Sequence, residues 1–498
     1  MDSPSGAGDA TGAAVPRLQD DPWRARHGRA APDYWEDPQV ITGSQYRESI
    51  LDGRVAYVDG RRITDLATDP VTRVAVDGVA EQYDRFYEPG EDARNPLFTP
   101  PRTQEDLRRI IDLLRGVDLI AHTTFTAVMT LLTVVPTLEK EHPVFAERAR
   151  AHLEKVRRED LRVTECITDA KGNRVLSPAK QPDEDAYLRV VERRPDGVVI
   201  RGAKLHITGA ALAHELFVMP TKKMVPGEED YAIACAVPAN APGVSTINTT
   251  YAPRTEDDRH FPLSRKRQMP DAMVIFDDVF VPNERIFLDG DTKYSALFAH
   301  SLGLWERLGG VAEMAHDGDL MVGLAMLVAE ANGLTRVSHV KEKISELVIY
   351  ATLVRAGLEA AIANAHRTDD GYLYPDELYT NAAKYHGAAE FNVMARHLID
   401  IGGAAVLTSP TLGDLEIPEL TKKIEKYMTA NTEVSGEQRM RIMHAIRDLT
   451  ADAFGGWHYV TNVHSGGGLY AQRIVTRKHY PVDEAVAMAR EAIGLPAA

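Results

Sequence analysis

The spacing of apolar residues divides the chain into a helical first third, a β-rich middle and a long helical end. Apolar positions three and four apart, the spacing of amphipathic helices, recur in three early segments: 103–115, 121–138 and 144–157. Thr103 and Asp106 have the spacing of a capping box, which places the start of the first helix. Residues 1–40 lack periodicity and are rich in Ala, Gly, Pro, Asp and Arg, so we expect a mostly disordered arm there.

The middle of the chain changes to strand patterns. Runs that alternate or are rich in β-branched residues, bounded by Pro, Gly and Asp, span three segments: 187–207, 230–237 and 272–281. Pro195-Asp196-Gly197 marks a turn inside the first segment, as expected for a hairpin. The pattern predicts an antiparallel barrel or sandwich.

Helical spacing returns near residue 295 and continues in long segments: 311–332, 337–365 and 376–402. Such long helices typically form a bundle. The apolar stripe from Val340 to Leu358 is broad, which favours burial against other subunits, so we expect a homotetramer or at least a dimer. The fold class is therefore α+β, and the expected parts are an arm (1–40), a helical domain (41–160), a β domain (161–294) and a bundle with a tail (295–498).

Charge and cysteine content narrow the classes of function. The formal net charge is −16, so the chain lacks the basic surface that nucleic acids or anionic membranes require. No run of about 20 apolar residues is evident, so we expect no membrane span. Cys166 and Cys235 are the only cysteines, which excludes a disulfide framework and a four-cysteine metal or iron–sulfur site. We expect a cytoplasmic protein without a metal site.

The segment 201–220, RGAKLHITGAALAHELFVMP, carries the first sign of a ligand site. Gly209 has no Cβ and lets the backbone approach a flat ligand, while the hydroxyl of Thr208 can donate and accept hydrogen bonds. These properties suit the edge of an isoalloxazine or a similar planar group. The alternative is an ordinary strand end followed by a tight turn.

Five stretches of the sequence resemble the family of 4-hydroxyphenylacetate 3-hydroxylase and 4-hydroxybutyryl-CoA dehydratase. They are GVVIRGAKLHITGAALAHE, MVIFDDVFVPNERIF, RVSHVKEKISELV, DIGGAAVLTSP and AQRIVTRKHY, and the resemblance runs from near residue 44 to near residue 495. It implies an acyl-CoA dehydrogenase-like fold, with an N-terminal helical domain, a middle antiparallel β-barrel and a C-terminal helical bundle. It also implies FAD bound between the β domain and the bundle, with a contribution from a neighbouring subunit.

The same resemblance implies which residues contact the cofactor. They are Thr168, Thr208, Gly209, Ala210, Gly402, Gly403, Asn462, His464, Ser465, Gly466 and Arg473. Backbone N–H groups of a glycine-rich turn can hold a pyrophosphate, and an arginine can add charge. For the C-terminal glycine run, the alternative is a loop that simply ends a helix.

Departures from the family are as informative as the matches. The dehydratase branch holds an iron–sulfur cluster, yet its two ligand segments, matched by 113–128 and 303–319, contain no cysteine here, so we expect no cluster. Asn462 matches the glutamate base of that branch and cannot take a proton. In the hydroxylase branch an Arg and a Tyr orient the phenol, and Ala121 and Phe125 stand at these positions. We therefore expect a less polar wall and a substrate other than a simple phenol carboxylate.

Three residues are candidates for the chemistry itself. His122 suits a general base or a donor to a substrate oxygen, or else a structural contact. His206 shares a strand face with Thr208 and can reach flavin or substrate. Asp169 is a substrate-side carboxylate or the corner of a turn.

Further residues are expected to bind the substrate or to support the fold. Ala121, Phe125, Trp305 and Arg307 form the expected substrate wall, with Trp305 stacking on an aromatic substrate. Arg307 and Glu306 are also expected to pair with each other. His214 is expected to be structural.

These observations favour a two-component monooxygenase that uses flavin hydroperoxide chemistry. FADH2 would come from a separate flavin reductase, because no GxGxxG fingerprint for a nicotinamide cofactor follows a strand. The substrate would be a small molecule of specialised metabolism, aromatic or carrier-bound. One alternative is a redox-neutral dehydratase or isomerase of acyl-CoA or carrier-bound acyl groups without a cluster. The other is a non-catalytic flavoprotein.

Overall fold

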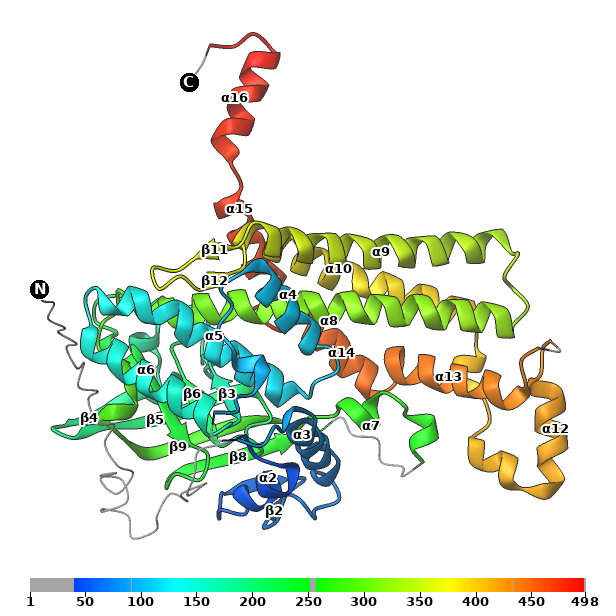
Figure 1. The fold of residues 1–498 in the computed structure, drawn as a ribbon, viewed down its shortest axis with the longest axis horizontal. Coiled ribbons are helices and arrows are strands. Elements are labelled where there is room, and N and C mark those ends of the chain that lie inside the picture. The colour runs from blue at the N-terminus through cyan, green and yellow to red at the C-terminus, as the bar shows by residue number, and fades with distance from the viewer. Residues whose placement is uncertain (1–39, 91, 251–256, 432, 497–498) are drawn as a thin grey trace, which may run out of the picture.

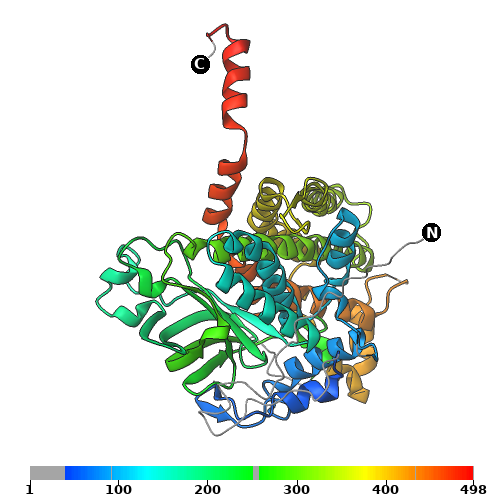
Figure 2. The same ribbon diagram turned by 60° about the vertical axis from the view of Figure 1, so that its left-hand side comes forward.

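The computed structural model describes residues 40–90, 92–250, 257–431 and 433–496 (Figure 1). The expected disordered arm therefore lies outside the described residues, except for residue 40. The described chain forms a layer of N-terminal helices, a β region and a long helical bundle (Figures 1 and 2).

The N-terminal helices confirm the helical first third. They are α2 (Gly43–Ser49), α3 (Arg73–Phe86), α4 (Gln104–Leu113), α5 (Leu119–Glu139) and α6 (Pro143–Arg158). The Thr103 side chain accepts from the backbone N–H of Asp106 and the Asp106 side chain accepts in return, so the predicted capping box is confirmed.

Helix α5 corrects one expectation from the sequence. Among the described residues it is the one helix long and apolar enough to cross a membrane, although no such segment was expected. Of its most apolar window, 78% is buried inside the protein, as in a core helix. Its hydrophobicity is explained by contacts with α6, α8 and β3.

The strands of the β region form two separate sheets rather than one continuous surface, and β11 and β12 pair on their own among the later helices. The larger sheet has the order β2-β1-β8-β9-β5-β4 and the smaller β10-β7-β6-β3. The strands are β1 (Ala56–Val58), β2 (Arg61–Ile63), β3 (Val163–Cys166), β4 (Arg189–Arg194), β5 (Gly197–Thr208), β6 (Glu215–Val218), β7 (Ile233–Pro238), β8 (Val244–Thr249), β9 (Asp271–Pro282) and β10 (Ile286–Asp289). The described residues form no closed barrel, so that detail of the expected fold is not confirmed.

The expected antiparallel pairing holds for most neighbours, but β1–β8 and β3–β6 are parallel. Strands β4 and β5 form the hairpin that the Pro195-Asp196-Gly197 turn predicted. The register of β5 against β9 shifts between Lys204 and Ile207, and His206 within this shift has a left-handed φ of 61°. Both cysteines, Cys166 and Cys235, lie in the apolar core between the sheets.

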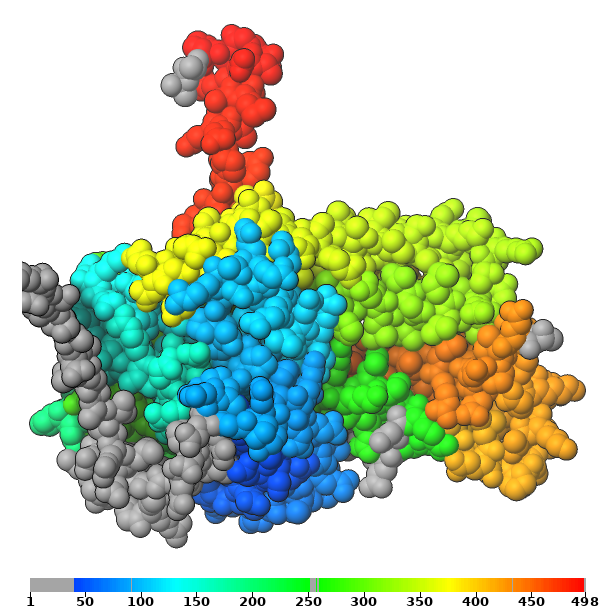
Figure 3. All heavy atoms as spheres, viewed as in Figure 1, coloured from blue at the N-terminus to red at the C-terminus, as the bar shows by residue number. Residues whose placement is uncertain are grey.

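The C-terminal half is a bundle of long helices, as predicted, and α8 begins at Ser295, where helical spacing was expected to return. The core of the bundle is α8 (Ser295–Ala331), α9 (Ser338–Ala363) and α10 (Glu377–Gly402), with α13 (Gly436–Thr450) and α14 (Ala453–His464) beside them. Shorter elements are α7 (Ser264–Arg267), α11 (Ala405–Thr408), α12 (Pro418–Met428), β11 (His366–Arg367) and β12 (Leu373–Tyr374). Helices α15 (Leu469–His479) and α16 (Val482–Ala492) lead away from the body, and α16 projects beyond it (Figures 1 and 3).

The apolar stripe of α9 is largely covered within the chain itself. Val340, Leu347, Val354 and Leu358 are buried, and α9 packs on α8 and α10. The apolar residues left exposed on α9 are Val348, which belongs to the predicted stripe, and Ile349 and Leu353, which do not.

Candidate active site

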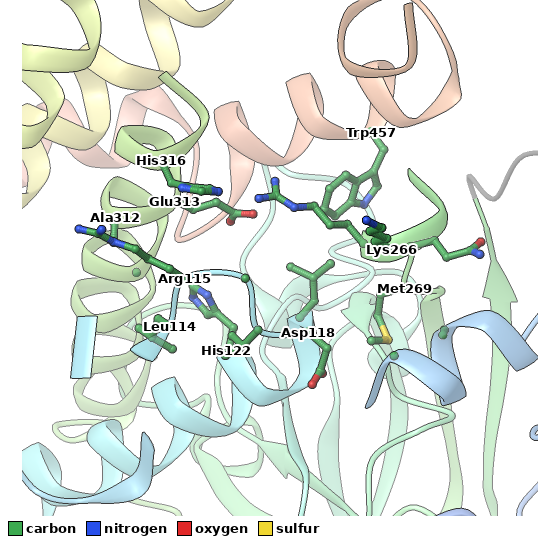
Figure 4. A pocket seen from close by; sticks show the side chains of 18 residues that line it. Leu114, Arg115, Asp118, His122, Lys266, Met269, Ala312, Glu313, His316 and Trp457 are labelled. Atoms are coloured by element: carbon green, nitrogen blue, oxygen red, sulfur yellow. The ribbon is translucent and has the colours of Figure 1, made fainter. Parts of the chain in front are cut away.

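A cleft opens where the helical layer, the bundle and the loop around α7 meet (Figure 4). The space between its walls is about 730 Å³, including the open solvent at its mouth. The turn before α5, helix α8, residues 266–269 and helix α14 supply its walls. Polar or aromatic side chains that line the cleft include those of Arg115, His122, Gln268, Glu313, His316 and Trp457.

His122 and Glu306 form an ion pair at the wall of this cleft. His122 Nε2 lies 3.2 Å from Glu306 Oε2, although the angle is not that of a well-aligned hydrogen bond. Burial alone would lower the pKa of His122, but the negative charges of Glu306 and, less strongly, Glu313 outweigh it and raise that pKa to about 9. Burial also opposes ionisation of Glu306, but the charge of His122 outweighs it and lowers the carboxyl pKa to about 2. At neutral pH the pair is an imidazolium and a carboxylate.

Groups behind the pair fix its position. Ser465 Oγ donates to Glu306 Oε1 at 2.5 Å. Gly309 leaves room for the imidazole, because an ideal Cβ there would lie 2.6 Å from His122 Nε2. The next residue, Gly310, faces Lys384, whose Nζ would be 3.1 Å from such a Cβ.

Two more ionisable groups, neither noticed in the sequence, lie near Glu306. Lys384 Nζ donates to the Asn462 carbonyl at 3.1 Å, and burial lowers the Lys384 pKa to about 8 against the attraction of Glu306. Glu165 accepts a hydrogen bond from Thr126, and burial together with the charge of Glu306 raises the Glu165 pKa well above its ordinary value. Glu165 is therefore the neutral member of two neighbouring carboxyl groups.

Thr208 forms a second polar group, at the junction of β5, β9 and α14. Its hydroxyl donates to Asp271 Oδ1 at 2.7 Å, and the indole N–H of Trp457 donates to Asp271 Oδ2 at 3.0 Å. Burial raises the pKa of Asp271, against these two hydrogen bonds. Gly209 follows with φ of 66°, and an ideal Cβ there would lie 3.0 Å from Ile120 Cδ1, so this position admits only glycine without movement.

Asp169 occupies a buried ion pair in the β region and does not line the cleft. Its Oδ1 lies 2.8 Å from Lys204 Nζ and accepts the backbone N–H of Leu188 at 2.9 Å. Lys204 also donates to the carbonyls of Ile167 and Met219. Thr168, which precedes Asp169, is half-buried and accepts the N–H of Leu205 at its carbonyl.

The expected substrate wall lies mostly in the hydrophobic core. Ala121 and Phe125 are fully buried, and Trp305 is 1% exposed. The Trp305 ring meets Phe125 edge-on at 5.8 Å, and its N–H donates to Thr133 Oγ1 at 2.9 Å. Arg307 donates to the Gly466 carbonyl at 2.8 Å, whereas Glu306 pairs with His122, so the expected Glu306–Arg307 pair is wrong.

The other predicted residues separate into groups. Asn462 contacts α10, and Ser465 and Gly466 contact α8, through the hydrogen bonds described above. His464 is exposed at the end of α14. Arg473 donates to the Tyr385 hydroxyl at 3.0 Å on the surface. Gly402 and Gly403 end α10, where an ideal Cβ on Gly402 would meet Val406 and Met443. The structure does not bring these two glycines to the cleft of the same chain.

Two histidines and one alanine complete the predicted set. His206 is exposed in the irregular part of β5 and lies close enough to lower the pKa of Asp271 by its charge. His214 is fully buried, accepts the N–H of Arg162 at Nδ1 and contacts Ser49 Oγ at 2.8 Å, as a structural histidine does. Ala210 is fully buried behind Gly209.

Comparison with known proteins assigns the chain to a family. Residues 42–288 match the model "4-hydroxyphenylacetate 3-hydroxylase N terminal", and residues 295–494 match "4-hydroxyphenylacetate 3-hydroxylase C terminal". One similar protein is the 4-hydroxybutyryl-CoA dehydratase/vinylacetyl-CoA-Delta-isomerase of Clostridium aminobutyricum, 27% identical over 92% of this chain and 100% of that protein. Another is the 4-nitrophenol 4-monooxygenase/4-nitrocatechol 2-monooxygenase oxygenase component of Rhodococcus opacus, 27% identical over 91% of each chain.

A solved structure agrees with these relatives. The oxygenase component of 4-hydroxyphenylacetate 3-monooxygenase in complex with FAD is 26% identical, has a TM-score of 0.83, and covers 91% of this chain and 99% of its own. The matched family models together span nearly all of the described residues. The chain belongs to the 4-hydroxyphenylacetate 3-hydroxylase family.

Proposed function

We propose that this protein is the oxygenase component of a two-component, FADH2-dependent monooxygenase. Family membership supports a flavin-dependent enzyme that binds FAD. A separate reductase would supply FADH2. In the overall reaction, substrate, FADH2 and O2 give hydroxylated substrate, FAD and water, with one oxygen atom of O2 going to the substrate and the other to water. The bound flavin supplies the activation of oxygen, and the protein binds, orients and shields the reactants.

The observation that carries this proposal is the polar group formed by Thr208, Asp271 and Trp457. It brings a hydroxyl, a carboxylate and an indole to one corner between the β region and the bundle. This corner includes the threonine that the family resemblance assigns to the flavin. Because its three members come from distant parts of the chain, the corner exists only in the folded protein.

The residues around this corner fit a flavin. Gln268 lines the cleft, and both polar atoms of its buried amide lack a hydrogen-bond partner among the described residues. One donor and one acceptor side by side match the pyrimidine edge of an isoalloxazine. The backbone at Gly209 adds a position without a Cβ, and Trp457 adds a flat apolar face. Thr208, Gly209, Gln268 and Trp457 are thus the residues that would hold the ring.

Other assignments extend the proposal to the rest of the site. His122 is the proposed substrate-side catalytic residue, because it lines the cleft. Ser465 and Gly466 would position the site from behind α8, and Gly402 and Gly403 would serve the cofactor of a neighbouring subunit in a homotetramer. We further propose the domain boundaries given above and a cytoplasmic location. Asp169 and Trp305 are better explained as parts of the core.

The redox-neutral dehydratase remains the second candidate, because that relative matches 92% of this chain at the same identity as the monooxygenase above. The walls of the cleft argue against it. Helices α5 and α8 carry no cysteine, and both cysteines are buried between the sheets, where burial raises the pKa of each thiol. Asn462, at the position of the dehydratase base, accepts a hydrogen bond from Lys384 at its carbonyl.

One experiment separates the candidates. The protein is supplied with FAD, a flavin reductase, NADH and isotopically labelled oxygen, together with a panel of phenols, phenol carboxylates and acyl thioesters. We expect oxygen consumption coupled to a product that carries labelled oxygen, with phenol carboxylates as poor substrates. Conversion of a thioester without oxygen consumption would show a dehydratase or isomerase, and no conversion across the panel would show a non-catalytic flavoprotein.

A matched variant tests the role of His122. We expect His122→Gln to bind FAD normally and to lose most product formation, because the imidazole faces the cleft. The control is His464→Gln, which changes an exposed histidine at the end of α14. Normal turnover by His122→Gln would show that His122 is not catalytic, and His206 would be the next candidate.

A further inference from the structure

We propose that His122 is a charged hydrogen-bond donor held in place by Glu306, and that it selects substrates with an ionised oxygen, such as a phenolate or an enolate. The inference rests on the proposed function, because it takes the cleft as the place where the substrate binds. It assigns Glu306 and Ser465 as positioning residues.

The two ring nitrogens of His122 face different surroundings. Nε2 points to Glu306, at 3.2 Å. No residue in the described part of the chain forms a hydrogen bond with Nδ1, and His122 lines the cleft. Figure 4 shows the imidazole projecting from α5 into the cleft beside Arg115. Nδ1 is therefore the nitrogen available to a bound molecule.

The charges around His122 keep the ring protonated. The titratable or charged groups around it and its partner are Glu306, Glu313 and His316 of α8, Glu165 of β3, Lys384 of α10, Arg115 and Asp118 of the turn before α5, and Lys266 and Arg267 of α7 across the cleft. Carboxylates dominate at short range, and they raise the pKa of His122 to about 9. With both ring nitrogens protonated, Nδ1–H donates and cannot accept. A general base at neutral pH, which the sequence left open, does not fit this environment.

The ring also has little freedom to turn away. Glu306 is held by the 2.5 Å hydrogen bond from Ser465, which comes from the loop between α14 and α15. On the other side the imidazole rests against the backbone of α8 at Gly309, where an ideal Cβ would lie 2.5 Å from its Cε1. The donor is thus set in one orientation before a substrate arrives, which reduces the cost of ordering it.

A fixed cationic donor discriminates between substrates by charge. A hydrogen bond from an imidazolium to an anionic oxygen is about twice as strong as one between neutral groups. The substrate's proton passes to solvent as the anion binds, so no residue of the site has to act as a base. An ionised phenol or enol is also richer in electrons at its ring or α-carbon, which is the carbon that an oxygen atom attacks.

The protonation of His122 is measured first, by histidine carbon NMR on the FAD-bound protein. The resonance is assigned by its loss in His122→Gln. We expect wild-type His122 to remain protonated well above neutral pH, and its titration midpoint to fall by more than one unit in Glu306→Gln. The control is Glu313→Gln, the same substitution on the same helix, for which we expect a smaller fall. Titration of the wild-type ring at its ordinary value, or an equal fall in both variants, would overturn the proposal.

Binding is then measured with 4-nitrophenol, whose ionised form absorbs visible light. We expect the wild-type, FAD-bound protein to enrich the phenolate at a pH where the free probe is mostly neutral. Glu306→Gln and His122→Gln should weaken phenolate binding about tenfold or more. The methyl ether 4-nitroanisole, which cannot ionise, should bind all three proteins equally.

A milder variant covers the case in which Glu306→Gln does not fold. Ser465→Ala removes only the hydrogen bond to Glu306, and we expect it to weaken phenolate binding about threefold to tenfold. Binding of the probe as the neutral phenol, or unchanged phenolate affinity in the variants that fold, would overturn the proposal.

These readouts do not depend on turnover, so the two proposals can fail separately. Selective phenolate binding without oxygen consumption would support the present inference and overturn only the monooxygenase. Hydroxylation by a protein whose His122 is neutral would support the monooxygenase and overturn the present inference.

Discussion

The hydroxyl of Thr208 at the end of β5 donates a 2.7 Å hydrogen bond to Asp271 at the start of β9. The other oxygen of the same carboxylate accepts the indole N–H of Trp457 from α14. One half-buried carboxylate thus links the two longest strands to the bundle at the place proposed for the flavin. The Thr208 hydroxyl oxygen still has acceptor capacity beyond this bond.

We expect Thr208→Val to weaken FAD binding by about 1 kcal/mol, because the valine removes a buried hydrogen-bonding group without changing the shape of the side chain much. FAD titration followed by flavin fluorescence gives the dissociation constant. Thr208→Ser keeps the hydroxyl and should bind FAD nearly as well as wild type. Equal affinity and spectra in all three proteins would show that the hydroxyl serves only Asp271.

Asp169→Asn should destabilise the protein by about 3–5 kcal/mol, because it leaves the buried ammonium of Lys204 without its counter-ion. Thermal unfolding measures this change. The control is Asp278→Asn, which breaks a surface ion pair with Arg201 and should cost less than about 1 kcal/mol. If the variant is fully stable but inactive, Asp169 has a catalytic role instead.

The purified protein should bind FAD without iron or acid-labile sulfide, because helices α5 and α8 offer no thiolate and both cysteines are buried between the sheets. Metal analysis by mass spectrometry, on protein prepared without oxygen, measures this. Iron in a fixed ratio to protein would contradict the prediction.

The exposed apolar residues of α9 should lie in a contact between subunits. Val348, Ile349 and Leu353 are roughly half exposed, and they form the part of α9 that the chain does not cover itself. We expect a tetramer or dimer by light scattering, and a smaller species for Ile349→Glu. Val175→Glu, at an exposed loop residue, is the control. A wild-type monomer at micromolar concentration would refute the prediction.

Stability should fall as the pH rises through about 9, because the pKa of His122 is raised in the folded protein. The contribution of the protonated ring is complete below its ordinary pKa of about 6.5 and is lost as the ring deprotonates. Glu306 has a lowered pKa, so its contribution is present above its ordinary value and is lost as the pH falls toward about 2. Thermal midpoints of wild type and His122→Gln should converge at alkaline pH. Parallel curves would show that the ion pair adds no stability.

Local patterns predicted the elements well, because the signals lie within a few residues of each other. The capping box at Thr103 and Asp106 fixed the start of α4, and Pro195-Asp196-Gly197 fixed a hairpin. The closed barrel was not confirmed, since the parallel contacts β1–β8 and β3–β6 join strands far apart in the sequence. Periodicity carries no information about such pairing.

The site was harder to predict than the fold. His122 was recognised, but its partner Glu306 was assigned to the adjacent Arg307, because neighbours in sequence are easier to pair than residues on different helices. Trp305 looked like a substrate platform, yet it is the kind of large apolar side chain that a core also needs. Lys384 could have been noticed in the sequence, because it is a charged residue on the apolar, buried face of α10. Such a charge on an apolar face points to a partner inside the protein.

Gly309 and Gly310 make room for His122 and Lys384, and this has a consequence for the mechanics of α8. Glycine lowers helix propensity by about 1 kcal/mol per residue relative to alanine, so two in succession form a weak point within the helix Ser295–Ala331. Paired small residues are also where long helices bend. Backbone amides next to the two glycines should exchange hydrogen for deuterium faster than those in the rest of the buried helix. Bending of α8 at this point would move Glu306 relative to His122, so the flexibility of one helix and the geometry of the donor are coupled.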